Sequence, residues 1–250
     1  MRKSLTRREF VVSAGGVIGL AFSGPLRAGP QTGGKQASAT PGRTVVVFQG
    51  DSITDGWRNR KVVSANQAVG LGTGYPLLVA AAALRAHPEA GLQFFNRGVG
   101  MSRVLDLHAR WKPDTLALKP DILSILIGVN DFWHKLTRGF TGTVADYERD
   151  YAALLARTRQ ALPKTRLVVM EPFALLCGDV DKTWFPEFDE RRSATARVAA
   201  SVGATFLPLQ EMFDGLAARR SPTYWTWDGA HPTPAGDAAI AERWRDVVGL

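Results

Sequence analysis

Residues 44–54 read TVVVFQGDSIT, a short continuous apolar run that leads directly into a turn with Gly50, Asp51 and Ser52. A short run rich in β-branched residues is typical of a strand that is buried on both faces, as in a parallel sheet. The Gly-Asp-Ser turn predicts a sharp exit from this strand, with the Ser52 hydroxyl presented at the strand's carboxyl end. The stretch therefore predicts an α/β fold with a serine at one edge of the sheet.

Strand and helix patterns alternate along the rest of the chain. Further strands are expected at residues 92–96, 121–127, 166–170 and 204–207. Helices are expected at residues 75–86, 104–111, 144–162, 186–202 and 233–248, with Thr233 as N-cap and Pro234 at the first position of the last helix. This alternation predicts a three-layer α/β/α sandwich, in which ligands bind at the carboxyl ends of the parallel strands.

The composition of the 250 residues, 45% hydrophobic and 22% charged, is typical of a globular protein. The single cysteine, Cys177, excludes a scaffold of internal disulfides and is expected to be a packing residue. Residues 1–39 hold six basic residues and one acidic residue, so much of the net charge of +8 comes from that segment. The remainder has no block of like charges and the chain has no long uncharged apolar run, so neither a nucleic-acid partner nor a stable membrane span is expected.

The first 39 residues have the pattern of an export signal. Arg7-Arg8-Glu9-Phe10 precedes an uncharged apolar stretch over residues 11–22, and Ala37-Ser38-Ala39 suits cleavage by a signal peptidase. The paired arginines resemble a bacterial twin-arginine signal. We therefore expect a twin-arginine-type signal peptide and tail at residues 1–39, a single domain at residues 40–250, and a periplasmic or secreted location.

Four short motifs fall where the predicted fold would gather them at one edge of the sheet. GDSIT at residues 50–54 follows the first strand, NRGVGMS at 96–102 the second and GVND at 128–131 the third, while DGAHP at 228–232 precedes the last helix. Each motif alone is weak, because Gly-rich and Asp-rich turns after strands are common. Their order, and their shared place at the carboxyl edge of one sheet, indicate a site.

These motifs contain the groups that acyl transfer requires. A serine hydroxyl becomes a nucleophile when an adjacent base takes its proton, which makes Ser52 the candidate nucleophile and His231 the candidate base. Asp228, three residues before His231, is placed to orient the imidazole and to stabilise its charged form. No metal and no cofactor is expected.

The oxyanion that develops in acyl transfer needs preorganised donors. The candidates are the side-chain amide of Asn130, the backbone N–H of Ser52, and a backbone N–H of the turn formed by Gly100 and Met101.

The four motifs resemble those of the SGNH hydrolase superfamily, also called GDSL, over residues 44–248. The resemblance implies a flavodoxin-like sheet of five parallel strands in the order 2-1-3-4-5, and no metal. It also implies that Ser52 is the nucleophile, Asn130 an oxyanion donor, and Asp228 with His231 the rest of a triad. One position departs from the pattern Asn-x-Gly-x-x-Gly, because Met101 stands where the final glycine is usual. The backbone N–H survives this change, but the side chain is expected to crowd the acyl pocket or to shift the donor role to Gly100.

A narrower likeness concerns bacterial serine acetylxylan esterases and related carbohydrate deacetylases. It rests on GYPLL at residues 74–78, IGVNDFW at 127–133 and WDGAHPTPAG at 227–236. Flat aromatic side chains suit sugar faces, so Trp133 and Trp227, with the nearby Trp225, are candidate substrate contacts.

Several acidic and imidazole side chains lie near the same edge. Asp51 and Asp131 are expected to accept backbone N–H groups within their own turns, and Asp51 is also a candidate substrate contact. Asp55, His134 and Glu171 are further candidates for contact with substrate.

The sequence thus predicts an exported serine esterase that removes O-acetyl groups from carbohydrates through an acyl-enzyme on Ser52. One alternative is a lipase or thioesterase that acts on longer acyl esters. Another is a catalytically weak protein that binds glycans, a reading favoured only by Met101. The expected partners are an acetylated carbohydrate or other small ester and the twin-arginine export machinery, and a homo-oligomer is left open.

Overall fold

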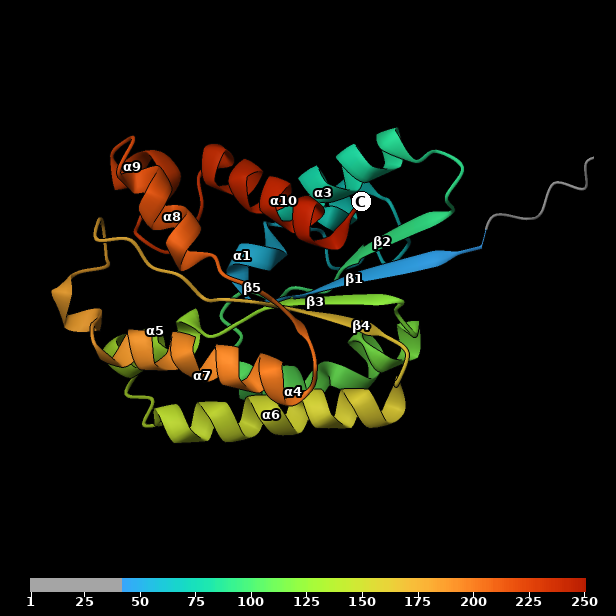
Figure 1. Cartoon of the computed structure of the whole chain (residues 1–250). Coiled ribbons are helices and arrows are strands. Elements are labelled where there is room, and N and C mark those ends of the chain that lie inside the picture. The colour runs from blue at the N-terminus through green and yellow to red at the C-terminus, as the bar shows by residue number, and fades with distance from the viewer. Residues whose placement is uncertain (1–41) are drawn as a thin grey trace, which may run out of the picture. The chain divides into compact units, whose positions relative to one another are not determined.

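The computed structural model describes residues 42–250, which form a five-stranded parallel sheet with helices on both faces (Figure 1). The sheet order is β2-β1-β3-β4-β5, as the resemblance predicted. The strands are β1 (Thr44–Gly50), β2 (Leu92–Asn96), β3 (Ile122–Leu126), β4 (Arg166–Met170) and β5 (Thr205–Leu207). The export signal expected at residues 1–39 lies outside the described residues.

Alternate side chains of β1 point into two separate cores because a strand has a period of two. Val46 and Phe48 pack in the core that contains helices α3 (Tyr75–Ala86) and α10 (Pro234–Val248). Val45 and Val47 pack in the core that contains α4 (Val104–Asp114), α6 (Val144–Ala161) and α7 (Glu187–Ser201). Figure 1 shows these two helix layers above and below the sheet. The predicted three-layer α/β/α sandwich is confirmed.

The predicted helices are present with small changes at their ends. Thr233 caps α10 as predicted, its side chain accepting the N–H of Gly236. The largest difference is α5 (Val129–Arg138). The GVND motif was expected to be a turn after the third strand, and it instead opens a helix that starts after Gly128 and buries Val129 and Phe132. The remaining helices, which were not predicted, are α1 (Ser52–Asp55), α2 (Ala68–Leu71), α8 (Gln210–Ala217) and α9 (Pro222–Trp225), with 3-10 turns η1 (Leu116–Leu118) and η2 (Lys182–Trp184). Within residues 42–250, no helix has the length and apolar character needed to cross a membrane.

Asn96, the last residue of β2, fastens together the turns at the carboxyl edge of the sheet. Its buried amide nitrogen donates to the carbonyl oxygens of Thr54 at 2.5 Å and Leu71 at 2.7 Å, while its side-chain oxygen accepts the N–H of Gly98 at 2.8 Å. A buried amide with its donors and acceptor satisfied holds a single arrangement of these turns. The loop after β2 is therefore fixed against the turn that carries Ser52.

Candidate active site

The turn between β1 and α1 presents Ser52 as the first residue of a short helix. Asp51 caps this helix by accepting the N–H of Ile53 at 3.0 Å, as predicted. A Cβ at Gly50 would collide with the Leu126 carbonyl oxygen and the Thr54 side chain, so only glycine fits where the strand meets β3. The expectation that Asp51 also contacts substrate is wrong, because its side chain lies beneath the turn and the residue is only 1% exposed.

Ser52, His231 and Asp228 form a continuous chain of hydrogen bonds. The Oγ of Ser52 lies 2.7 Å from Nε2 of His231, and Nδ1 of His231 lies 2.6 Å from Oδ2 of Asp228. The other oxygen of Asp228, Oδ1, accepts the backbone N–H of His231 at 2.7 Å and that of Ala230 at 3.0 Å. The structure thus brings the three predicted residues together with the spacing of a serine–histidine–aspartate triad.

The electrostatics of the pair suit a base that takes a proton from serine. Burial alone would lower the pKa of His231, but the hydrogen bond and charge of Asp228, with the charges of Asp51 and Asp179, hold it above its ordinary value of 6.5. Burial alone would raise the pKa of Asp228, but its hydrogen bonds with His231 and Ala230 hold it below its ordinary value. Asp228 is therefore ionised when His231 is neutral, and it favours the imidazolium that forms in the reaction.

A neighbouring segment, residues 171–181, braces the loop that carries Asp228 and His231. The N–H of Leu175 donates to the Gly229 carbonyl at 2.8 Å, and the N–H of Asp179 donates to the Asp228 carbonyl at 2.9 Å. A Cβ at Gly229, whose φ is +97°, would collide with the backbone of this segment. The loop that carries Asp228 and His231 is thus held at two points by backbone hydrogen bonds from residues 171–181.

The predicted oxyanion donors are only partly available. Asn130 is buried and donates one amide hydrogen to the Ser102 carbonyl at 3.1 Å, which leaves its second amide hydrogen unused. Among the described residues, the N–H groups of Ser52 and Met101 have no acceptor. The N–H of Gly100 instead donates to the Asp55 carboxylate at 2.9 Å. The expectation that Gly100 is an oxyanion donor is therefore wrong, and the free N–H in this turn is that of Met101.

Met101 adopts the left-handed conformation that its glycine-like position demands, with a φ of +69°. A residue with a Cβ pays roughly 1–2 kcal/mol for this conformation, which a glycine would not. The side chain is 44% exposed and projects at the rim of the site. The substitution thus keeps the backbone donor and adds bulk beside it.

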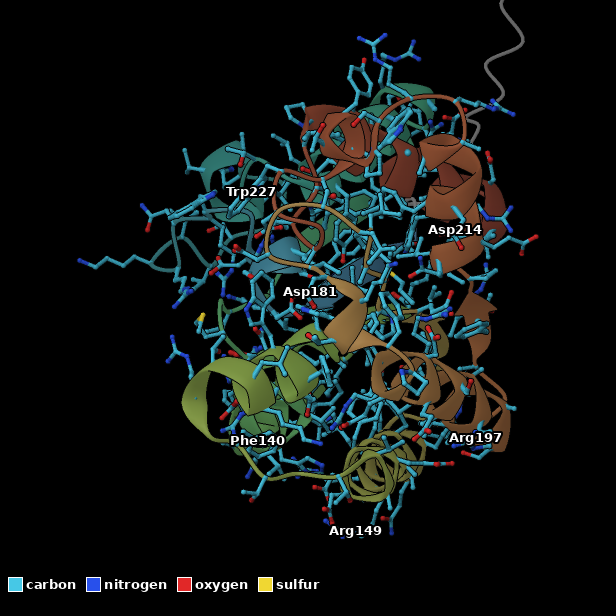
Figure 2. All side chains as sticks on the ribbon, turned by 90° about the vertical axis from the view of Figure 1, so that its left-hand side faces the viewer. Phe140, Arg149, Asp181, Arg197, Asp214 and Trp227 are labelled. Atoms are coloured by element: carbon cyan, nitrogen blue, oxygen red, sulfur yellow. The ribbon has the colours of Figure 1, made fainter. Side chains whose placement is uncertain are left out.

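Ser52 and His231 line a cavity of about 570 Å³, here called the serine cavity. Its walls include Trp57, Met101 and Trp227. The Trp227 ring stacks on the His231 ring, with centroids 5.1 Å apart and planes 16° apart, yet it remains 62% exposed. Trp227 lies on the face of the molecule seen in Figure 2. An exposed flat ring beside the base is available to a ligand that lies over the cavity.

The other two predicted tryptophans, Trp133 and Trp225, are not among the residues that line this cavity. Trp133, on α5, packs against Trp184 and has its ring centroid 5.7 Å from that of His231, so it supports the base from the side. Trp225, in α9, donates its indole N–H to the Leu216 carbonyl and does not line the serine cavity. Trp57, which no sequence motif indicated as a site residue, follows the GDSIT motif closely and is 93% exposed at the cavity wall.

Of the remaining acidic and imidazole candidates, two make structural contacts and two line cavities. Asp131 accepts the N–H of Val104, the first residue of α4, so the expectation that it caps its own turn is wrong. Glu171 accepts from Arg192 and the N–H of Gln210, which are structural contacts.

Asp55 and His134 lie at cavity walls. Asp55 lines the serine cavity, forms an ion pair with Arg60 and accepts the backbone N–H of Gly100. His134 lines a neighbouring cavity. Within residues 42–250, no group of three or more His, Cys, Asp or Glu side chains is arranged to hold a metal ion.

Comparisons with known proteins agree on one family. The model of the GDSL-like lipase/acylhydrolase family matches residues 48–239. The chain is 30% identical over 207 residues to an acetylxylan esterase of Geobacillus stearothermophilus, a match that covers 82% of this chain and 94% of the esterase.

Solved structures share nearly the whole fold. A Parabacteroides merdae protein assigned as a GDSL-like lipase superposes with a TM-score of 0.81 at 38% identity, covering 84% of this chain and 99% of its own. The crystal structure of the Geobacillus stearothermophilus acetylxylan esterase gives a TM-score of 0.74 at 28% identity, covering 85% and 97%. Because the family match runs across all four motifs, this chain belongs to the GDSL-like lipase/acylhydrolase family and is a serine ester hydrolase.

Proposed function

We propose that this enzyme removes O-acetyl groups from carbohydrates through an acetyl-enzyme formed on Ser52. The observation that carries the proposal is the hydrogen-bonded chain from Ser52 through His231 to Asp228, set at the floor of a cavity whose rim holds an exposed tryptophan. The likeness to an acetylxylan esterase supports the same class of substrate.

In the first half of the reaction, Ser52 Oγ attacks the acetyl carbonyl carbon while Nε2 of His231 takes the hydroxyl proton. The oxyanion of the tetrahedral intermediate is held by the N–H groups of Ser52 and Met101 and by the free amide hydrogen of Asn130. Collapse of the intermediate breaks the bond to the sugar oxygen, which leaves with the proton from His231. Ser52 then carries the acetyl group.

In the second half, water attacks the acetyl-enzyme and gives a proton to Nε2 of His231. The second tetrahedral intermediate uses the same donors, and its collapse returns that proton to Ser52 Oγ and releases acetate. Asp228 stays ionised throughout and stabilises the imidazolium in both halves.

The surroundings of Ser52 favour a small acyl group and a flat leaving group. The Met101 side chain stands beside the proposed oxyanion donors, where it restricts the space for a long acyl chain. Trp227 offers an exposed ring stacked on His231, the residue that gives the leaving sugar oxygen its proton. An acetyl group on a sugar fits both features.

The test uses the full-length chain and its Ser52→Ala variant with 4-nitrophenyl acetate, butyrate and octanoate and with acetylated xylooligosaccharides. The proposal expects hydrolysis of acetate esters well above octanoate, release of acetate from the oligosaccharides, and loss of both activities in a folded Ser52→Ala protein. A preference for octanoate would instead identify a lipase or thioesterase. Binding of the oligosaccharide without turnover would identify a glycan-binding protein.

We also propose that the enzyme is exported by the twin-arginine route and acts in the periplasm or outside the cell. The proposal is supported by Arg7 and Arg8 before the apolar stretch over residues 11–22. Cell fractionation of the full-length chain beside an Arg7→Lys, Arg8→Lys double variant tests it. Export predicts that the esterase activity moves from the periplasm to the cytoplasm in the variant. An unchanged distribution would refute the route.

A further inference from the structure

A second cavity, of about 620 Å³, adjoins the serine cavity and is here called the arginine cavity. Its walls include Met101, Arg103, Arg110, His134, Arg138 and Phe140. Gly100 and Met101 line both cavities, so the second cavity begins at the residues that bound the first. Figure 2 shows Trp227, from the serine cavity, and Phe140, from the arginine cavity, on the same face of the molecule.

Arg110 has a structural role at the carboxyl edge of the sheet. Its guanidinium donates to the carbonyl oxygens of Arg97 and Gly50 at 2.6 and 3.0 Å. It also donates to the Gln49 side chain and pairs with Asp114. Arg110 therefore contributes positive charge to the cavity wall, but its hydrogen-bonding capacity is largely used.

Arg103 and Arg138 are the cationic side chains that a ligand in the arginine cavity can contact. Arg103 pairs with Asp106 at 3.0 Å, and its guanidinium lies 4.5 Å from the centre of the Phe140 ring, which fixes its place in the wall. Arg138 is exposed in the last turn of α5 and has no carboxylate within ion-pair distance among residues 42–250. The cavity wall thus holds three arginines and one carboxylate, a net positive charge.

His134 adds a polar group without a protein partner. The residue is only 7% exposed, and its buried Nε2 has no hydrogen-bond partner among the described residues. Burial first, and then the charges of Arg138 and Arg103, lower the pKa of His134, so the imidazole is neutral at pH 7. Because this nitrogen is itself buried, the donors that a ligand in the cavity can reach are those of the arginines.

We propose that the arginine cavity binds a carboxylate of the substrate, so that the preferred substrate is an acetylated oligosaccharide with a uronic acid residue near the acetylated sugar. This inference rests on the proposed function and names its substrate class more closely. Arg138 supplies a charged planar donor that matches a carboxylate, and the free N–H groups of Arg103 add to it. Because Met101 lines both cavities, one oligosaccharide can place its acetyl group at Ser52 and its carboxylate beyond Met101.

The test compares two acetylated xylooligosaccharides that differ in one group. One carries a glucuronic acid branch, and the other is the same compound with that carboxylate reduced to an alcohol, which removes the charge and nearly keeps the size. Acetate release is measured with the full-length enzyme, with Arg138→Gln, and with Arg85→Gln. Arg85 is the matched control because it is exposed in the last turn of α3, outside both cavities, so its change removes the same charge from a similar helix position.

The proposal expects the wild-type kcat/KM to be about tenfold higher for the uronic acid compound, mainly through a lower KM. Arg138→Gln should reduce this preference to about twofold, whereas Arg85→Gln should leave it in place. Equal rates on the two compounds, or a preference that Arg138→Gln does not change, would overturn the inference while deacetylation of the neutral compound still supports the proposed function. Hydrolysis of 4-nitrophenyl acetate without deacetylation of either oligosaccharide would overturn both.

Discussion

The Nε2 atom of His231 lies 2.7 Å from the Oγ of Ser52, although the two residues are 179 positions apart in the chain. The distance is set by the sheet, because Ser52 follows β1, which lies between β2 and β3, and His231 lies in the loop before α10, which packs against the core residues of β1. Trp244 of α10 donates its indole N–H to Ser124 of β3 at 2.9 Å, which anchors this helix.

The acid limb of the pH profile should report His231. Only the neutral imidazole accepts the serine proton, and the pKa of His231 is held above 6.5, so kcat/KM should fall as the pH drops through a value above 6.5. In Asp228→Asn, the amide retains an oxygen for the backbone N–H groups but offers a donor to Nδ1, which favours the wrong tautomer. The expected result is a loss of about 10⁴-fold in kcat. A profile of 4-nitrophenyl acetate hydrolysis over pH 5–9 measures both effects, and an acid limb well below 6.5 would contradict the first.

Replacement of Asn130 by alanine should remove one oxyanion donor. The expected loss is about 10²–10³-fold in kcat, because the amide acts on charge that develops in the transition state. The change in KM should be small. Circular dichroism and thermal unfolding serve as the control, since the variant also loses the hydrogen bond to the Ser102 carbonyl. A variant that raises KM and keeps kcat would show that Asn130 binds substrate instead.

Met101→Gly should relax the choice of acyl chain. The variant keeps the backbone N–H and removes both the side chain at the cavity rim and the strain of a φ of +69°. We expect the ratio of octanoate to acetate hydrolysis to rise severalfold. Met101→Ala, which also shortens the side chain but keeps a Cβ at this φ, should shift the ratio in the same direction. An unchanged ratio in both variants would show that another residue limits the acyl pocket.

Asp237→Asn should change how stability depends on pH. Burial raises the pKa of Asp237 to about 7 in the folded protein, against an ordinary value of 3.8, although the side chain accepts the N–H of Tyr75 at 2.9 Å. The folded state therefore binds this proton more tightly, and the group destabilises the fold progressively as the pH rises from about 4 to about 7. The asparagine keeps an acceptor for Tyr75 and has no proton to lose.

The stability of Asp237→Asn relative to wild type should thus rise by up to about 4 kcal/mol between pH 4 and pH 8. Urea unfolding at several pH values measures this difference. Asp246→Asn, an exposed change on the same helix, is the matched control. A relative stability of Asp237→Asn that stays flat across this range would mean that the carboxylate is well solvated.

Much of the fold could be predicted because its strands are short apolar runs between clear turn signals. The positions of β2 and β4 follow directly from the pattern, whereas the strand order came from a family resemblance, since alternation alone does not order a sheet. The helix α5 was missed because Gly128-Val129-Asn130-Asp131 has the composition of a turn, and only the tertiary packing of Val129 and Phe132 makes it helical.

The site could be predicted in its residue types and only partly in its contacts. Ser52, His231 and Asp228 are recognisable because the chemistry requires these groups in these motifs. The loss of Gly100 as a donor could not be foreseen, because it depends on Asp55, which lies 45 positions earlier in the chain. Likewise Arg138 lies in a helix that the sequence pattern did not indicate, so nothing placed it beside the site.

The nucleophile directly follows the first strand, while its base and acid lie just before the last helix, on a loop held by the backbone of residues 171–181. Hydrolysis can therefore begin only after the chain has been synthesised almost to its end and α10 has docked on the sheet. A nascent or clipped chain that lacks this helix carries Ser52 without the support that its base requires. Turnover regained during refolding consequently measures completion of the whole domain, and it will lag behind any spectroscopic probe that reports the sheet alone.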